Sequence, residues 1–90
     1  MIIGFKLKED FVTSEIDSKS IILNLISGKY YSSNEVGSHI INVISSKNNV
    51  TIDELYEILY GKFDCSIDKI IEETDEFINK LLEYEVISKD

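Results

Sequence analysis

The amino-acid sequence predicts an α+β fold in which a three-stranded antiparallel sheet is followed by three helices. Apolar residues alternate with period two at Ile21, Leu23 and Leu25 and recur with 3.6-residue spacing from Val36 onwards. The two patterns meet in residues 21–37 (IILNLISGKYYSSNEVG), where a hairpin signal directly precedes a helix start. This order, strands first and helices afterwards, is typical of α+β domains.

The hairpin is predicted from a β-rich run that a short turn interrupts. Apolar residues alternate on one side of its first strand: Ile21, Leu23 and Leu25. Ser27-Gly28 supplies the turn, and residues 29–33 return as a more polar strand that contains Tyr30 and Tyr31. Neighbouring side chains of a strand point to opposite faces, so only one tyrosine can face a core. A purely structural role for both remains an open alternative to a role in binding.

A further strand is predicted before the hairpin. Residues 11–16 combine β-branched and aromatic side chains, and Asp17-Ser18-Lys19 follow as a turn. Together with the hairpin they form a three-stranded meander. Residues 1–10 mix apolar and charged side chains without a sustained period, so we interpret residues 6–10 as a lead-in whose order depends on what it contacts.

Each helix start is marked by a residue that can cap it. Asn34, Thr51 and Ser66 carry side-chain oxygens that can accept hydrogen bonds from the first free amides of a helix. Glu54 stands three residues after Thr51 and completes a capping box. The third helix is the longest, and we expect it to reach about Tyr84.

The apolar residues of the third helix cover a wide arc of about 140°, more than one contact requires. We expect one edge of this arc to face the core: Ile70, Phe77 and Leu81. The other edge, which we expect to face something else, contains Ile71, Ile78 and Leu82.

Composition limits the domain count and the class of partner. A chain of 90 residues is expected to form a single domain, residues 1–90, with a modest core. Its net charge is −8, from 17 acidic groups and nine lysines without any arginine. The field of such a chain repels polyanions, and it lacks the guanidinium fork that reads phosphate and guanine. Nucleic acid is therefore not an expected partner.

No catalytic or metal-binding arrangement is predicted. One cysteine excludes an internal disulfide, and one cysteine with one histidine is too few for a structural zinc site. His39 and Cys65 lack the neighbours that would make a base or a nucleophile, so we interpret both as ordinary packing or surface residues. Four acidic residues in the third helix are interpreted as a solvated face: Glu72, Glu73, Asp75 and Glu76. We expect no enzyme activity, no cofactor and no metal.

The expected location is the cytoplasm. No stretch approaches the roughly 20 apolar residues of a membrane span. The apolar run at the N-terminus is too short for a signal peptide and no basic region precedes it.

Residues 21–37 also carry a resemblance to a known family. A hydrophobic strand, a Ser-Gly turn, Tyr30-Tyr31 and then Asn34-Glu35-x-Gly37 opening a helix resemble the PqqD family. Its members are also called recognition elements for precursors of ribosomally synthesised and post-translationally modified peptides (RiPPs). The resemblance covers about residues 5–87, and the segments 50–55 and 77–82 match the family's second and third helices. Two residues depart from the pattern. Ser33 stands where the family usually has leucine, and Ile41 where it often has tryptophan.

The resemblance implies a winged-helix-like domain that binds the leader peptide of a ribosomally synthesised precursor. The peptide would join the sheet as an extra strand and be presented to modifying or leader-cleaving enzymes of RiPP, lasso-peptide or PQQ-like biosynthesis. Among these settings the lasso-peptide one is favoured. The module would have no chemistry of its own, and would be a monomer or a dimer formed through the open strand edge.

By the same resemblance, the peptide-binding residues are expected on the third strand and the third helix. The strand residues are Lys29, Tyr30, Tyr31, Ser32 and Ser33. The helix residues, on the edge expected to face away from the core, are Ile71, Thr74, Asp75, Ile78 and Leu82.

The alternative from another class is a winged-helix DNA-binding regulator whose third helix enters the major groove. Charge opposes it, because residues 67–84 hold six acidic groups against two lysines, a balance of −4.

Overall fold

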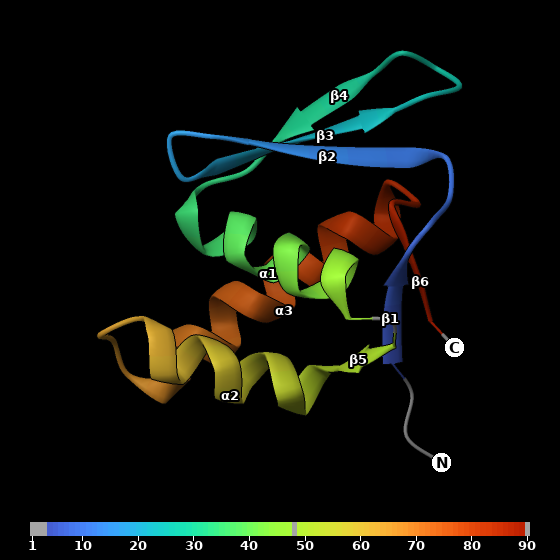
Figure 1. The fold of residues 1–90 in the computed structure, drawn as a ribbon. Coiled ribbons are helices and arrows are strands. Elements are labelled where there is room, and N and C mark those ends of the chain that lie inside the picture. The colour runs from blue at the N-terminus through green and yellow to red at the C-terminus, as the bar shows by residue number, and fades with distance from the viewer. Residues whose placement is uncertain (1–3, 48, 90) are drawn as a thin grey trace.

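The computed structural model describes residues 4–47 and 49–89, and in them two small antiparallel sheets combine with three helices (Figure 1). The elements in chain order are β1 (Gly4–Leu7), β2 (Phe11–Ile16), β3 (Lys19–Asn24), β4 (Tyr30–Ser32), α1 (Glu35–Ser46), β5 (Val50–Thr51), α2 (Ile52–Lys62), α3 (Ile67–Glu83) and β6 (Ile87–Lys89). The α+β class is confirmed, as are the three-stranded meander and the three helices that follow it.

The meander has the strand order β2-β3-β4, and all its neighbours are antiparallel. Asp17 and Ser18 form the first turn with φ values of 51° and 66°, as the two-residue turns of tight hairpins require. The second turn is longer than expected, because Asn24 ends β3 early. Its side-chain oxygen accepts from the amides of Ile26 and Ser27, at 2.9 and 3.2 Å, and Gly28 supplies the positive φ of 77° that brings the chain back.

The meander has one face towards the helices and one face without a helix over it (Figure 1). Ile22 pairs with Tyr31 on the inner face, where Ile22 is buried and Tyr31 half-buried. Leu23 pairs with Tyr30 on the outer face, where Tyr30 is 70 % exposed. The two tyrosines therefore point to opposite faces, as strand alternation predicts.

The second sheet was not predicted from the sequence. Its order is β5-β1-β6, with β1 in the middle and antiparallel to both neighbours. Residues 4–7, which overlap the expected lead-in, are thus a strand, and Phe5 in it is buried. Two to four residues carry too little periodicity to indicate a strand, and the partners come from three distant parts of the chain.

The core surrounds α1, which lies between the meander and the pair α2 and α3 (Figure 1). The buried apolar residues are Phe5, Phe11, Ile22, Ile40, Ile41, Ile44, Val50, Leu55, Leu59, Ile70, Ile78, Leu81, Val86 and Ile87. Every element except β4 contributes to this cluster, so one continuous core holds both sheets and all three helices.

All three predicted helix caps are present. The Asn34 side-chain oxygen accepts from the Gly37 amide at 2.8 Å, and the Ser66 hydroxyl accepts from the Lys69 amide at 3.3 Å. The Thr51 hydroxyl accepts from the Glu54 amide at 3.2 Å, while the Glu54 carboxylate accepts from the Thr51 amide at 3.3 Å. Each cap satisfies amides that have no partner inside the helix.

We expect Thr51→Ala to lower the free energy of unfolding by about 1 kcal/mol, because it removes the acceptor of this capping box. Urea denaturation followed by circular dichroism measures the change. Ser46→Ala is the matched control, since its exposed hydroxyl only donates to the carbonyls of the turn before it, and it should change stability by less than about 0.5 kcal/mol. Equal effects of the two variants would contradict this assignment.

Candidate functional site

Strand β4 is an edge of the meander, and its backbone is bonded on one side by β3. The Lys29 carbonyl accepts from Asn24, and the Ser33 amide donates to Ser20, both at 2.9 Å. In antiparallel pairing the bonded residues alternate, so the backbone groups of Tyr30 and Ser32 point away from β3. Two amides and two carbonyls thus face the open edge.

Strand β2 forms the other edge of the same sheet. The Asp10 carbonyl accepts from Leu25 at 2.8 Å, so by the same alternation the backbone of Thr13 points away from β3. The two edges differ in what lies beside them, because only β4 is stacked against the end of a helix.

That stack joins Tyr31 of β4 to Tyr84, which ends α3. Their ring centroids lie 4.5 Å apart and the rings are nearly parallel, with 5° between the planes. Such aromatic pairs stabilise beyond the area they bury. The stack sets the C-terminal end of α3 against the inner face of β4.

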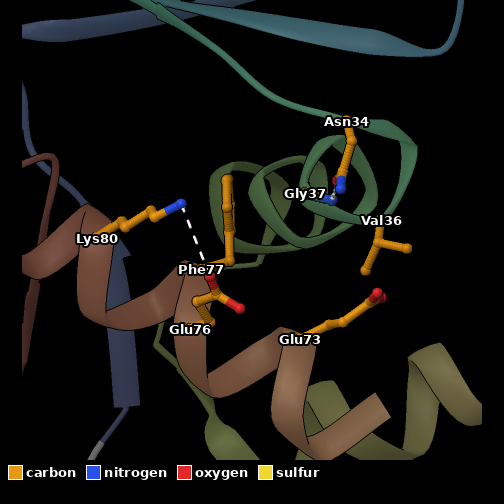
Figure 2. Close-up of a pocket in the computed structure, with 7 residues that line it drawn as sticks. All are labelled: Asn34, Val36, Gly37, Glu73, Glu76, Phe77 and Lys80. Atoms are coloured by element: carbon orange, nitrogen blue, oxygen red, sulfur yellow. Dashed lines mark hydrogen bonds and ion pairs between the residues drawn. The ribbon is translucent and has the colours of Figure 1, made fainter. Parts of the chain in front are cut away.

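A cavity of about 140 Å³ opens between the start of α1 and α3 (Figure 2). Its lining residues are Asn34, Val36, Gly37, Glu73, Glu76, Phe77 and Lys80. In Figure 2 the Phe77 ring stands between Gly37 and Lys80. The Lys80 ammonium lies 3.9 Å from the Glu76 carboxylate, and since both side chains are exposed this ion pair contributes little stability.

Gly37 lets Phe77 reach the first turn of α1. A Cβ atom at position 37 would lie 2.8 Å from Phe77 Cε1 and 3.0 Å from the Cβ of Ser33. Real Cβ atoms do not approach other carbon atoms that closely, so a larger residue would move Phe77. The glycine of the Asn-Glu-x-Gly motif therefore sets the distance between α1 and α3.

Three buried serines connect the meander to α1. The Ser20 amide donates to the Ser33 hydroxyl at 3.2 Å, and the hydroxyls of Ser20 and Ser38 lie 2.7 Å apart. These bonds satisfy polar groups that burial would otherwise leave unpaired. They give a physical reason for Ser33, which departs from the family pattern, because its hydroxyl has a partner in the buried junction.

A family model described as "Coenzyme PQQ synthesis protein D (PqqD)" matches residues 19–87. The chain belongs to the PqqD family. The matched residues run from β3 to the start of β6 and so contain β4, the three helices and the cavity. The resemblance carried by residues 21–37 is thereby confirmed.

Two solved structures share the fold of this PqqD-family chain. One is described as TbiB1 in complex with the TbiA(beta) leader peptide. It is 19 % identical, the match covers 92 % of this chain and 94 % of that one, and the TM-score is 0.80. The other is described as lasso peptide synthetase B1 complexed with the leader peptide. It is 14 % identical, with 94 % and 98 % covered and a TM-score of 0.78. No curated protein matches the sequence significantly.

None of the five expected helix residues lines the cavity. Thr74 and Ile78 are in the core, and Asp75 accepts a hydrogen bond from the Tyr56 hydroxyl of α2. Ile71 and Leu82 are half-buried on the same flank of the helix as Asp75. The opposite flank carries Phe77, Lys80 and Tyr84, which line the cavity or contact Tyr31.

The expected rotation of this helix is wrong at Ile78, which we expected to face away from the core and which is buried. Phe77 is half-buried, packs against the core as expected, and also lines the cavity. Ile70 and Leu81 are in the core as expected. Helices α1 and α2 both pack on α3, so two of its sides are covered, and periodicity alone does not tell which helix covers which side.

The strand residues lie where the sequence predicts, on or next to the open edge. Tyr30 and Ser32 are exposed, and Tyr31 faces α3. Ser33 is buried and bonded to Ser20, so its part in the site is to hold the end of β4.

His39 and Cys65 are far apart in the chain and have ordinary surroundings. The His39 ring contacts Phe63 edge-on, with centroids 5.9 Å apart, and Cys65 lies half-buried between α2 and α3. Across residues 4–47 and 49–89, no group of three or more His, Cys, Asp and Glu could hold a metal ion. In the same residues no helix is both long and apolar enough to span a bilayer.

The hydrogen bond between Tyr56 and Asp75 joins α2 to α3 and changes the acidity of the phenol. Burial, then the bond to Asp75 and its charge, and then the charge of Asp53 raise the pKa of Tyr56 to about 12. A phenolate at this position would lose the bond and face two carboxylates.

We expect Gly37→Ala to destabilise the protein by about 1 kcal/mol, since overpacking against Phe77 outweighs the better helix propensity of alanine. Gly61→Ala is the matched control. Gly61 lies in α2, and a Cβ atom added there would meet open space, so alanine should stabilise by up to about 1 kcal/mol. In a Phe77→Ala background the cost of Gly37→Ala should disappear. Additive effects in this double-mutant cycle, measured by urea denaturation, would show that the two residues do not press on each other.

We expect a spectrophotometric titration of the protein at 295 nm to contain a late component near pH 12, from Tyr56. Tyr56→Phe should remove this late component, and Asp75→Asn should bring it to lower pH. Because the folded pKa lies above the unfolded value of about 10, the bond stabilises fully below that pH and its contribution is lost as the pH rises through about 12. A late component that persists in Tyr56→Phe would assign it to another tyrosine.

Proposed function

We propose that this chain binds the leader segment of a ribosomally synthesised precursor peptide along β4 and presents it to an enzyme that modifies or cleaves the precursor. The observation that carries the proposal is the open edge of β4. The inner face of this strand contacts Tyr84 at the end of α3, and the chain continues from β4 to Asn34, which lines the cavity. Family membership and fold support it, since both solved relatives are described as complexes with leader peptides.

The binding mode is strand addition. An extended peptide beside β4 can bond with both backbone groups of Tyr30 and of Ser32, which gives affinity without regard to side chains. Its side chains alternate, so every second one points to the inner face, towards Tyr31, Tyr84 and Phe77. On that face, the aromatic rings and the cavity that Phe77 lines select among the side chains of the peptide.

The site is one for binding and not for chemistry. The strand and the helix flank offer backbone groups, aromatic rings and an exposed Lys80–Glu76 pair, and neither His39 nor Cys65 lies among the lining residues. We propose that a separate cytoplasmic enzyme performs the chemistry. Among the RiPP pathways we favour a lasso-peptide pathway, and the solved relative described as lasso peptide synthetase B1 supports that preference.

DNA binding is the weaker alternative. A recognition helix needs a free face with positive charge. Helix α3 packs on α1 and α2 and contacts Tyr31, and it carries far more carboxylates than lysines. Addition of mixed-sequence DNA in an electrophoretic shift should leave the protein unbound.

We expect Ser32→Pro to weaken peptide binding at least tenfold, because proline removes the outward amide of β4 and leaves the bonds to β3 in place. The probe is a synthetic peptide that copies the leader of a precursor gene adjacent to this one, and calorimetry gives the affinity. The melting temperature should fall by only a few degrees.

Thr13→Pro is the matched control. It removes an outward amide from β2, the other edge of the same sheet, and should leave the affinity unchanged. The reverse result, loss of binding in Thr13→Pro and full binding in Ser32→Pro, would move the peptide to the β2 edge and contradict the proposal.

A further inference from the structure

The outer face of the meander carries an uncovered row of apolar side chains. Val12, Leu23 and Tyr30 are direct cross-strand neighbours in this row. Val12 is 44 % exposed, Leu23 is half-buried and Tyr30 is 70 % exposed. The helices all lie on the other side of the sheet (Figure 1). The most exposed of the three side chains, Tyr30, thus stands at the open edge.

The next row on this face has a different character. Ser14, Ile21 and Ser32 are its cross-strand neighbours, so a serine stands at the open edge. None of the six residues in the two rows is charged. Along the open edge, the outer face therefore offers one large apolar side chain and one small polar one, with no charge to pair with.

We propose that a peptide added to β4 is also read on this outer face, and that Tyr30 selects an apolar side chain directly opposite itself. This inference rests on the proposed function. Residues that face each other across two strands point to the same face, so the peptide residue paired with Tyr30 lies over the outer row. An aromatic or β-branched side chain there covers the exposed ring and removes further apolar surface from water.

The register gives a pattern for the recognised segment. The peptide residue opposite Tyr31 points to the inner face of the sheet. The peptide residue opposite Ser32 points to the outer face, beside the Ser32 hydroxyl. The peptide therefore has an apolar outer position and, two residues away, an outer position that accepts polar side chains. A charged side chain opposite Tyr30 would be partly desolvated without a partner, so it is selected against.

The size of the effect follows from the chemistry of cross-strand pairs. An aromatic pair of this kind changes an affinity by up to about fivefold. Tyr30 therefore tunes the choice of peptide, while the backbone bonds of β4 supply most of the binding.

A displayed library of random dodecapeptides tests the proposal, because it does not require the sequence of the precursor. The full chain is used in three forms: the parent, Tyr30→Lys, and Tyr60→Lys as a matched control at a tyrosine of α2 that is 56 % exposed. The parent should enrich peptides with an apolar residue at one outer position. Tyr30→Lys should enrich Asp or Glu at that same position and keep the rest of the pattern, and Tyr60→Lys should match the parent.

An affinity cycle with one selected peptide gives the second measurement. Replacing its apolar outer residue by serine should weaken binding to the parent about fivefold, and binding to Tyr30→Ser less than twofold. Circular dichroism confirms that the variants are folded.

The failures are distinguishable. If Tyr30→Lys enriches the same residues as the parent, or the cycle is additive, while Ser32→Pro abolishes binding of the selected peptides, then Tyr30 selects nothing and the proposed function stands. If the parent enriches no peptide, or Ser32→Pro binds the selected peptides as tightly as the parent, then the edge is not the site and both proposals fall.

Discussion

The structure depends on the burial of α1 from two sides. Ile40 and Ile41 are neighbours in sequence, point about 100° apart on the helix, and are both fully buried. The meander covers one side of α1, and α2 with α3 covers another. Strand β4 leads directly into α1, and α3 packs against the first turn of α1. The burial of α1 therefore also places the open strand edge beside the flank of α3 that carries Phe77 and Tyr84.

Small residues at the start of α1 make that close arrangement possible. Gly37 admits the Phe77 ring, and Ser33 and Ser38 bond to Ser20 within the junction. A substitution costs more stability in a cluster of buried hydroxyls than in an apolar cluster, because losing one hydrogen-bond partner leaves the others buried and unpaired. The end of β4 is thus held in one position relative to α1, and an edge that is held in position loses little freedom when a peptide joins it.

An open edge is also a risk, because it can pair with any extended chain. Strand β4 has three residues, and Ser32 at its edge is polar, so it offers only a short ladder to a second copy of the protein. A peptide and a second copy would compete for the same backbone groups. Side-chain contacts beyond the ladder would favour a matching peptide over a second copy, and in the proposed binding mode the rings of Tyr31 and Tyr84 on one face and of Tyr30 on the other provide them.

The sequence by itself determined the features that depend on residues close together in the chain. The caps at Asn34, Thr51 and Ser66 and the opposite faces of Tyr30 and Tyr31 depend on residues at most four positions apart, so their patterns could be recognised. The strand residues of the candidate site were expected from the family resemblance carried by residues 21–37. The rotation of α3 depends on which helix covers which flank, as in the Tyr56–Asp75 bond, and the sheet of β1, β5 and β6 joins segments more than 35 residues apart. Only the tertiary structure decided these, because the free energy that selects among equally apolar faces comes from contacts between distant parts of the chain.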